Sequence, residues 1–254
     1  TVGVGMDRAI QSAAEDAVEP VVQQAMLVAV SASTGDVLAV AQNPAADAEG
    51  PLALTGRYPP GSTFKVATAT AAMAEDGLTV DTPVACPATT VIGGRLVPNA
   101  GRFDLGTVPL RTAFAHSCNT TFAQLATQLD PGALPAAALR LGLGADYAVP
   151  GIATITGSVP ASAEEVLRAE NGFGQGQVLT SPFGVALAAA TVARGEPVVP
   201  QLIRGRPTEV LVPATAPDPA ALAPLRSMMR AVVTEGTATA LAGLGEVYGK
   251  TGTA

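Results

Sequence analysis

Strand-like patterns lie near both ends of the 254-residue chain, and helical patterns occupy most of the sequence between them. Two apolar runs, 26–32 and 37–41, flank a short turn that contains Gly35, which predicts a β-hairpin in which Gly35 has a positive φ angle. A further strand is expected at 246–253. Because strands and helices do not alternate along the chain, this order predicts an α+β fold, with an antiparallel sheet flanked by helices and a mostly helical lobe.

Capping and stop signals mark the expected helices. Asp7 is the expected N-cap of a helix that ends near Pro20, and Ser162 with Glu165 forms a capping-box pattern for a helix that ends before position 171. Further helices are expected at 62–76, 108–115, 120–129, 182–194 and 220–234, a short strand at 202–204, and irregular structure at 78–110. No repeat and no clear linker divides the chain, so residues 1–254 are interpreted as one domain.

The composition excludes several classes of protein. Hydrophobic residues make up 48% of the chain and charged residues 14%, which excludes general disorder. The formal net charge of −7 and the pI of about 4.7 argue against a partner that is a nucleic acid or an anionic membrane. One histidine and two cysteines are too few for a zinc finger or a multi-histidine metal site.

Both lysines of the chain lie in short motifs, although 14 residues are basic. Ser62 follows two prolines and a glycine at the expected start of a helix, and Lys65 lies one turn further on the same face. A serine hydroxyl needs a base to become a nucleophile, and a buried lysine, unlike an arginine, can lose its proton near neutral pH. The first N–H groups of the helix could stabilise an oxyanion. The alternative is a solvated helix face that carries an ordinary surface lysine.

Two further motifs carry hydroxyl and amide groups. Ser117-Cys118-Asn119 falls between two expected helices and could relay a proton and hold a substrate amide, or it could simply cap a helix. His116 precedes it, but the chain lacks the G-x-S-x-G motif of serine–histidine esterases. The segment 250–253, of sequence K-T-G-T, lies on the expected C-terminal strand. Its glycine would allow a substrate backbone to approach and its lysine and hydroxyls would suit a carboxylate, although it could also be an ordinary strand end.

The three motifs S-x-x-K, S-x-N and K-T-G occur in this order and together use both lysines. This set is typical of β-lactamases and penicillin-binding proteins. The sequence resembles the transpeptidase domain of the monofunctional, class B penicillin-binding proteins over nearly its whole length. The resemblance also rests on segments 6–15, 58–65, 174–182 and 229–238.

The resemblance implies a role for each catalytic group. Ser62 would be the acylated nucleophile and Lys65 its base. Ser117 would pass a proton to the leaving amine, and Lys250 would support the electrostatics of the site. Burial and the charge of Lys250 are both expected to lower the pKa of Lys65.

The resemblance also implies a substrate-binding set. Asn119 would orient the substrate amide, and Thr251 and Thr253, with Gly252 between them, would bind the terminal carboxylate. The backbone N–H groups of Ser62 and Thr253 would form the oxyanion hole.

The implied activity is acyl transfer from D-Ala-D-Ala stem peptides of peptidoglycan by a D,D-transpeptidase that β-lactams acylate and inhibit. No metal or organic cofactor and no nucleic acid is implied. The implied location is the extracytoplasmic face of the bacterial membrane, with cell-wall synthesis proteins as partners and a membrane anchor in the full-length protein. The alternatives are a D,D-carboxypeptidase or serine β-lactamase, in which water deacylates the enzyme, and a non-enzymatic β-lactam sensor.

Two expectations concern the ends and the cysteines of the chain. The family fold continues beyond K-T-G-T with more strands and a helix, so a chain that stops at Ala254 is expected to be a fragment that contains only the catalytic domain. An extracytoplasmic location would permit a disulfide between Cys86 and Cys118, but spacing alone does not measure their separation. We expect free or buried thiols.

Overall fold

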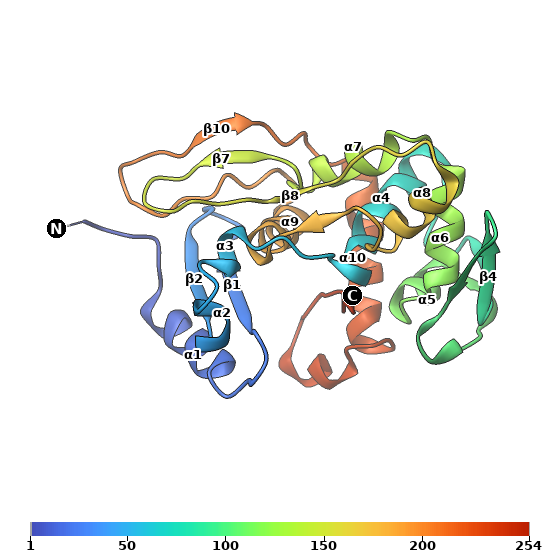
Figure 1. Cartoon of the computed structure of the whole chain (residues 1–254), viewed down its shortest axis with the longest axis horizontal. Coiled ribbons are helices and arrows are strands. Elements are labelled where there is room, and N and C mark those ends of the chain that lie inside the picture. Colours follow the sequence, from blue (N-terminus) through green and yellow to red (C-terminus); the bar gives the residue numbers. More distant parts are fainter. Residues whose placement is uncertain (1, 254) are drawn as a thin grey trace. The chain divides into compact units, whose positions relative to one another are not determined.

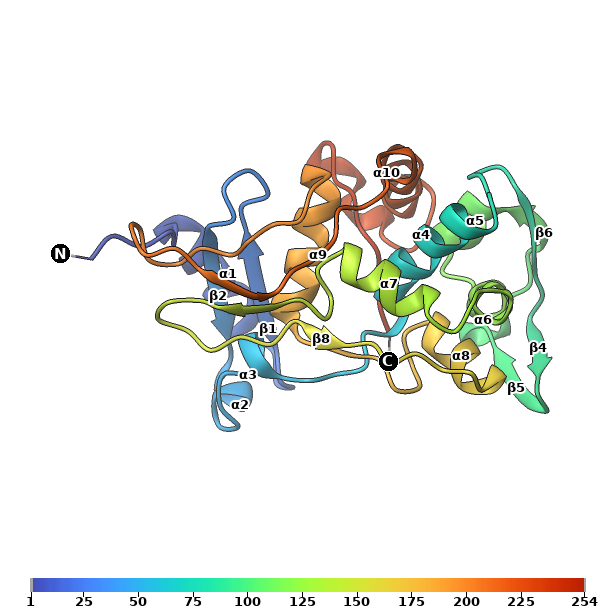
Figure 2. The ribbon, with the colours of Figure 1, turned by 90° about the horizontal axis from the view of Figure 1, so that it is seen from above.

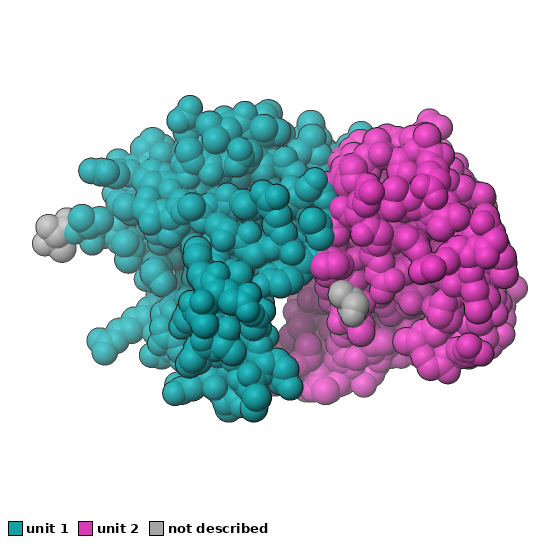
Figure 3. Space-filling view, in the orientation of Figure 1, with its two compact units in different colours: residues 1–58, 138–158, 179–217 teal, residues 59–137, 159–178, 218–254 magenta. Residues whose placement is uncertain are grey.

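The computed structural model describes residues 2–253, which form two compact units (Figure 3). The first unit contains the chain up to Tyr58 together with Ala138–Ser158 and Leu179–Pro217. The second contains Pro59–Ala137, Val159–Val178 and the chain from Asp218 onward. Every residue of the three motifs therefore lies in the second unit.

The first unit is built on the predicted hairpin (Figure 1). Strands β1 (Met26–Val30) and β2 (Val37–Gln42) pair antiparallel, and Gly35 in the turn has a φ angle of 79°. Because side chains alternate along a strand, the two faces of the hairpin pack on different helices. Ala39 and Ala41 pack on α1 (Arg8–Val18), and Val28 and Val40 pack on the cluster that contains the core residues of α9 (Pro182–Arg194).

Local signals in the first unit agree with the helix ends. The Asp7 carboxylate accepts hydrogen bonds from the backbone N–H groups at the start of α1. Ser181 caps α9, which Gly195 ends with a φ angle of 89°. The remaining elements are two short helices and two strand pairs: α2 (Pro44–Asp47), α3 (Leu52–Thr55), β7 (Asp146–Ala148) with β10 (Glu209–Val212), and β8 (Gly157–Ser158) with β9 (Leu179–Thr180).

The second unit is mostly helical (Figure 2). Its helices are α4 (Lys65–Glu75), α5 (Leu110–Ala115), α6 (Asn119–Gln128), α8 (Glu165–Gly172) and α10 (Pro219–Thr234). Helix α4 contacts both α6 and α10, and α10 also packs on α5. Single 3₁₀ segments cover Gly61–Phe64, Ala100–Arg102 and Thr239–Leu244. Helix α7 (Ala133–Arg140) begins in the second unit and ends in the first, because the division falls after Ala137.

The prediction of irregular structure at 78–110 was wrong. Strand β3 (Pro83–Cys86) pairs with β6 (Gly106–Pro109), and β4 (Thr89–Ile92) pairs with β5 (Arg95–Pro98), both antiparallel. Gly93 and Gly94 between β4 and β5 both have positive φ angles, as a tight hairpin turn requires. The helix expected at 108–115 consequently begins only at Leu110.

Three other local predictions were also wrong. Residue 203 makes only an isolated bridge with Val4, so 202–204 is not a strand. Residues 246–253 are not a strand either, because α10 holds this segment through a bond from the Gly249 N–H to the Met229 carbonyl. Ser162 accepts a hydrogen bond from the nearby Glu164 N–H and lies in a turn before α8, so it does not form a capping box.

The α+β class is confirmed, but the described strands form five two-stranded antiparallel pairs and not one larger sheet. Within residues 2–253, no helix has both the length and the apolar character needed to cross a bilayer.

Candidate active site

Ser62 lies in the turn that leads into α4. The preceding residue, Gly61, has a φ angle of 54°, and its N–H donates to the carbonyl of Gly174 at 2.9 Å. A Cβ atom on Gly174 would overlap the Gly61 carbonyl oxygen, so only glycine fits where these two loops meet. The helical conformation that follows places Lys65 one turn beyond Ser62, with its Nζ 2.9 Å from Ser62 Oγ.

Lys65 is fully buried and its amine is surrounded by oxygen atoms. Besides Ser62 Oγ, the amine lies 2.8 Å from the Ser117 carbonyl, 3.2 Å from Ser117 Oγ and 2.6 Å from Asn119 Oδ1. Burial penalises the charged form and the charge of Lys250 adds repulsion, so the pKa of Lys65 is well below its ordinary value of 10.5. The expected direction of this pKa shift and both of its expected causes are confirmed.

The partners of Lys65 fit a neutral amine. A carbonyl oxygen and a carboxamide oxygen can only accept hydrogen bonds, so the Ser117 carbonyl and Asn119 Oδ1 take the two hydrogens of the neutral amine. The nitrogen lone pair is then left for a hydroxyl proton, and Ser62 Oγ is at the right distance to supply it. This arrangement can activate the Ser62 hydroxyl as a nucleophile.

Ser117 has an unusual backbone conformation between α5 and α6. Its φ angle is 62°, a region that costs a residue other than glycine on the order of 1–3 kcal/mol. The conformation points both its carbonyl and its hydroxyl at Lys65. The same hydroxyl accepts a hydrogen bond from Lys250 Nζ at 2.9 Å, so it lies between the two amines and can pass a proton.

Cys118 forms a disulfide with Cys86, at the end of β3, so the expectation of free thiols was wrong. The chain passes from β3 to the start of α6 in a way that brings the two Cα atoms within 6.1 Å, a separation that spacing in the sequence does not reveal. The Thr121 hydroxyl donates to the Ala85 carbonyl and fixes the same junction. The disulfide therefore anchors the residue between Ser117 and Asn119.

Lys250 approaches from the C-terminal segment. Its amine also donates to the Thr251 carbonyl at 3.0 Å, and burial lowers its pKa to about 8. Each amine lies over an aromatic ring: Lys65 Nζ is 5.6 Å from the centroid of Phe122 and Lys250 Nζ is 5.6 Å from that of Phe114. A ring face attracts a cation, so Phe114 offsets part of the cost of burying the charged form of Lys250, and Phe122 does the same for Lys65 once that amine has accepted a proton.

An open cleft of about 650 Å³ joins these groups. It is lined by the side chains of three motifs and by residues from neighbouring loops: Ser62, Ala100, Phe103, Leu105, His116, Ser117, Asn119, Gln175, Thr237, Thr251, Gly252 and Thr253. The structure thus brings all eight motif residues predicted for the site to one place, with the two lysine amines in contact with Ser117. Of the polar cleft residues, the sequence interpretation gave no role to His116, Gln175 or Thr237, and it gave none to the apolar Ala100, Phe103 and Leu105. Thr237 and Gln175 fall within segments that carry the family resemblance, which is the only signal that pointed to them.

Gly252 packs against the turn that carries Ser62. A Cβ atom there would lie 2.8 Å from Thr63 Cγ2 and 3.1 Å from the Pro60 carbonyl. Glycine at this position therefore lets the K-T-G-T segment approach the turn that carries Ser62. Among residues 2–253, no three His, Cys, Asp or Glu side chains are grouped so that they could hold a metal ion.

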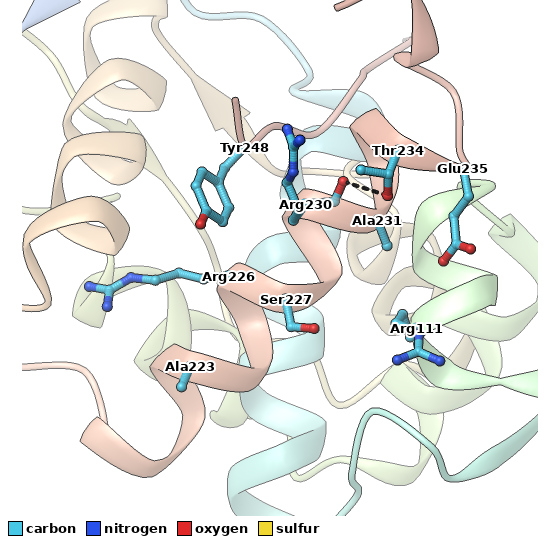
Figure 4. Close-up of a pocket in the computed structure, with 9 residues that line it drawn as sticks. All are labelled: Arg111, Ala223, Arg226, Ser227, Arg230, Ala231, Thr234, Glu235 and Tyr248. Atoms are coloured by element: carbon cyan, nitrogen blue, oxygen red, sulfur yellow. Dashed lines mark hydrogen bonds between the residues drawn. The ribbon is translucent and has the colours of Figure 1, made fainter. Parts of the chain in front are cut away.

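A second cavity, of about 600 Å³, lies beside α10 (Figure 4). Figure 4 shows the guanidinium groups of Arg111, Arg226 and Arg230 pointing in different directions, so they do not converge on one ligand position. Arg230 instead donates to the carbonyls of Gly245 and Val247, at 3.1 and 2.8 Å. Helix α10 thereby holds the segment that leads to Lys250.

Comparisons with known proteins extend these observations. The penicillin binding protein transpeptidase domain, as a family, matches residues 25–254. The peptidoglycan D,D-transpeptidase PbpA of Mycobacterium tuberculosis is 33% identical over 147 residues, which cover 56% of this chain and 30% of that protein. The chain thus matches less than a third of the length of this relative.

Solved structures of two penicillin-binding proteins are also similar. PBP2 of Pseudomonas aeruginosa, in complex with WCK 5153, has a TM-score of 0.86 at 28% identity and covers 100% of this chain and 67% of its own. Penicillin-binding protein A of M. tuberculosis, solved as a penicillin G acyl-enzyme complex, has a TM-score of 0.78 at 26% identity. The match covers 92% of this chain and 63% of that protein's chain. The match over 25–254 shows that the chain belongs to the family of penicillin-binding protein transpeptidase domains.

Proposed function

We propose that residues 1–254 act as the catalytic domain of an acyl-serine D,D-transpeptidase, which cross-links peptidoglycan stem peptides and is acylated by β-lactams. The observation that carries the proposal is the 2.9 Å contact between Ser62 Oγ and a fully buried Lys65 amine whose pKa is lowered. A relative named as a D,D-transpeptidase and a similar structure captured as a penicillin G acyl-enzyme support it.

Acylation begins when Ser62 Oγ attacks the carbonyl carbon of the penultimate D-Ala and Lys65 accepts the hydroxyl proton. The backbone N–H groups of Ser62 and Thr253 stabilise the oxyanion of the tetrahedral intermediate. The C–N bond then breaks, and the leaving amine of the terminal D-Ala takes a proton from the Ser117 hydroxyl. Ser117 recovers that proton from Lys65, which lies 3.2 Å away and has just been protonated. The products are an ester on Ser62 and free D-Ala.

The substrate would be held by two sets of polar groups. The Asn119 carboxamide, whose nitrogen now donates to the Pro98 carbonyl at 3.2 Å, orients the substrate amide. The hydroxyls of Thr251 and Thr253, beside Gly252, bind the terminal carboxylate, and the charge of Lys250 stabilises that anion.

The acyl group would pass to an amine of a second stem peptide. No Asp or Glu is among the described residues that line the cleft, so no carboxylate there is in place to activate a water molecule. This observation counts against a β-lactamase in which a carboxylate activates the water. Lys65 can act as the base for water as well as for an amine, so the product ratio measured below separates a D,D-carboxypeptidase from a transpeptidase. The proposal includes action on the extracytoplasmic side of the membrane, with an anchor and cell-wall synthesis partners in the full-length protein.

Intact-mass spectrometry of the chain after mixing with benzylpenicillin tests the nucleophile. The wild type should gain the mass of one penicillin, and Ser62→Ala should gain none. Incubation with a D-Ala-D-Ala stem peptide and an amine acceptor should then yield free D-Ala and a cross-linked product in excess of the hydrolysed one. An adduct that persists in Ser62→Ala would refute the assignment, and a chain that is acylated but never turns over peptide would favour the sensor.

A further inference from the structure

Two threonine hydroxyls meet at the edge of the cleft. Thr237 Oγ1 lies 2.6 Å from Thr251 Oγ1, a short distance for a hydrogen bond between two hydroxyls, and both residues line the cleft. Thr251 belongs to the K-T-G-T segment, whereas Thr237 follows α10 and lies outside the three motifs S-x-x-K, S-x-N and K-T-G. The pair therefore links two segments of the site through side chains alone.

Thr237 is fixed in place by its own backbone. Its N–H donates to the Ala115 carbonyl at the end of α5, at 3.2 Å, and the next N–H, of Ala238, donates to the Val232 carbonyl at 2.9 Å. A Cβ atom on Gly236 would overlap the same Ala115 carbonyl oxygen, so this loop packs as closely as glycine allows. These backbone contacts, which do not involve substrate, hold Thr237 against Ala115, two residues before Ser117 in the sequence.

The direction of the hydrogen bond decides what Thr251 offers to a ligand. Each hydroxyl has one hydrogen, and a carboxylate can only accept hydrogen bonds. If Thr251 donates to Thr237, only lone pairs of Thr251 remain for the anion. If Thr237 donates to Thr251, the Thr251 hydrogen is free to point at the anion. The other acceptor near Thr237 Oγ1, the Ala115 carbonyl, is 3.5 Å away and already receives the Thr237 N–H, which leaves Thr251 Oγ1 as the better acceptor.

We propose that Thr237 is a positioning residue: its hydroxyl donates to Thr251 Oγ1 and so directs the Thr251 hydrogen toward the carboxylate of the substrate or of a β-lactam. The proposal rests on the proposed function and deepens it, because it names the group that makes Thr251 a donor. Thr237 acts through Thr251, so its effect should appear only with ligands that carry a free carboxylate.

The test compares Thr237→Val with Thr237→Ser, using benzylpenicillin and its methyl ester as paired probes. Valine keeps the shape of threonine without the hydroxyl, and serine keeps the hydroxyl. We expect Thr237→Val to lower the second-order rate constant of acylation by benzylpenicillin about tenfold, the scale of one hydrogen bond to an anion. Acylation by the methyl ester should change less than about twofold, and Thr237→Ser should restore the rate with benzylpenicillin. Thr239→Val, in the exposed segment that follows, is the matched control and should leave both rates unchanged.

A double-variant cycle makes the test specific to the hydroxyl pair. In a Thr251→Val background, Thr237→Val should cause no further loss, because the hydroxyl that it orients is gone. Equal losses with the acid and the ester, additive effects of the two substitutions, or no loss in Thr237→Val would each overturn the inference. These outcomes leave the proposed function intact, since that function fails only if wild-type Ser62 is not acylated at all.

Discussion

Raising the pH from 7 to 9 should slow acylation by benzylpenicillin about tenfold, and Lys250→Arg should abolish that loss. Burial lowers the pKa of Lys250 to about 8, and only its charged form attracts the carboxylate of the ligand. At pH 7 about ten in eleven Lys250 amines are protonated, and at pH 9 about one in eleven, which gives the tenfold ratio. An arginine in the same place stays charged over this whole range.

Lys65 governs the acid side of the profile with the opposite sign. As the base it must be neutral, and its pKa is well below 10.5, so the rate should rise with pH until that lowered pKa has been passed. The tenfold ratio between pH 7 and pH 9 is the contribution of Lys250 alone, for enzyme in which Lys65 is already neutral. The profile is therefore bell-shaped, with its alkaline limb centred near pH 8. Because the two amines interact, the apparent pKa values that the profile reports belong to the pair.

Stopped-flow acylation between pH 5 and pH 10 would measure both limbs, with the methyl ester of benzylpenicillin as a probe that should lack the alkaline one. The reasoning about Lys250 is refuted if the alkaline limb persists in Lys250→Arg or appears equally with the ester. Lys65→Arg should lower the rate at least about 100-fold at every pH, since a guanidinium does not accept the proton of Ser62. A Lys65→Arg variant with full activity would falsify the assignment of the base.

Two further substitutions test how the site is held. Replacing Cys86 and Cys118 together with alanine should lower the free energy of unfolding in urea by about 3–4 kcal/mol, because the disulfide closes a loop with a sequence separation of 32; a loss below about 1 kcal/mol would contradict this. Gly174→Ala should slow acylation at least about 100-fold, since the added Cβ displaces the turn that carries Ser62. Gly77 is the control: its φ angle of 64° is close to the 79° of Gly174, but the space around it is open. Gly77→Ala should therefore lower the free energy of unfolding by about 1–2 kcal/mol and leave acylation unchanged. Equal slowing in the two glycine variants would show that backbone strain, and not the contact, is responsible.

Local signals predicted the parts of the fold that depend on neighbours in the sequence. Asp7 caps its helix through N–H groups two and three residues away, and Gly35 lies in the short connection between Val30 and Val37, so each signal is complete within a short window. Strands require a partner that can lie far along the chain. The segment 246–253 has a strand-like composition, but its backbone contacts in the structure are with α10, and composition alone does not reveal this.

The candidate site was predictable to the extent that its chemistry is unusual. The chain has only two lysines among its 14 Lys and Arg residues, and each lies in a motif with serine or threonine. This pattern predicted the site, and both amines do contact the Ser117 hydroxyl. Thr237 carries no such signal, because a threonine in a loop after a helix is ordinary and its importance comes from one contact with Thr251. The Cys86–Cys118 disulfide was mispredicted for the same reason: it depends on a distance between β3 and α6.

The segments of the site meet where no Cβ atom fits, and this explains why the site depends on glycines that perform no chemistry. Two such contacts join backbone to backbone, Gly174 against Gly61 and Gly236 against Ala115. At Gly252 the fit is looser, because a Cβ atom there would meet the Thr63 side chain at 2.8 Å and the Pro60 carbonyl at 3.1 Å. Proton transfer requires the hydroxyl and amine atoms to keep separations near 3 Å, and a displacement of about 1 Å can cost a hundredfold in rate. A backbone packed directly on another backbone has less freedom to shift than one separated from it by a flexible side chain. The glycines therefore serve catalysis by fixing the distances among Ser62, Lys65 and Ser117. Substitutions at Gly174, Gly236 and Gly252 should impair acylation more than they impair folding.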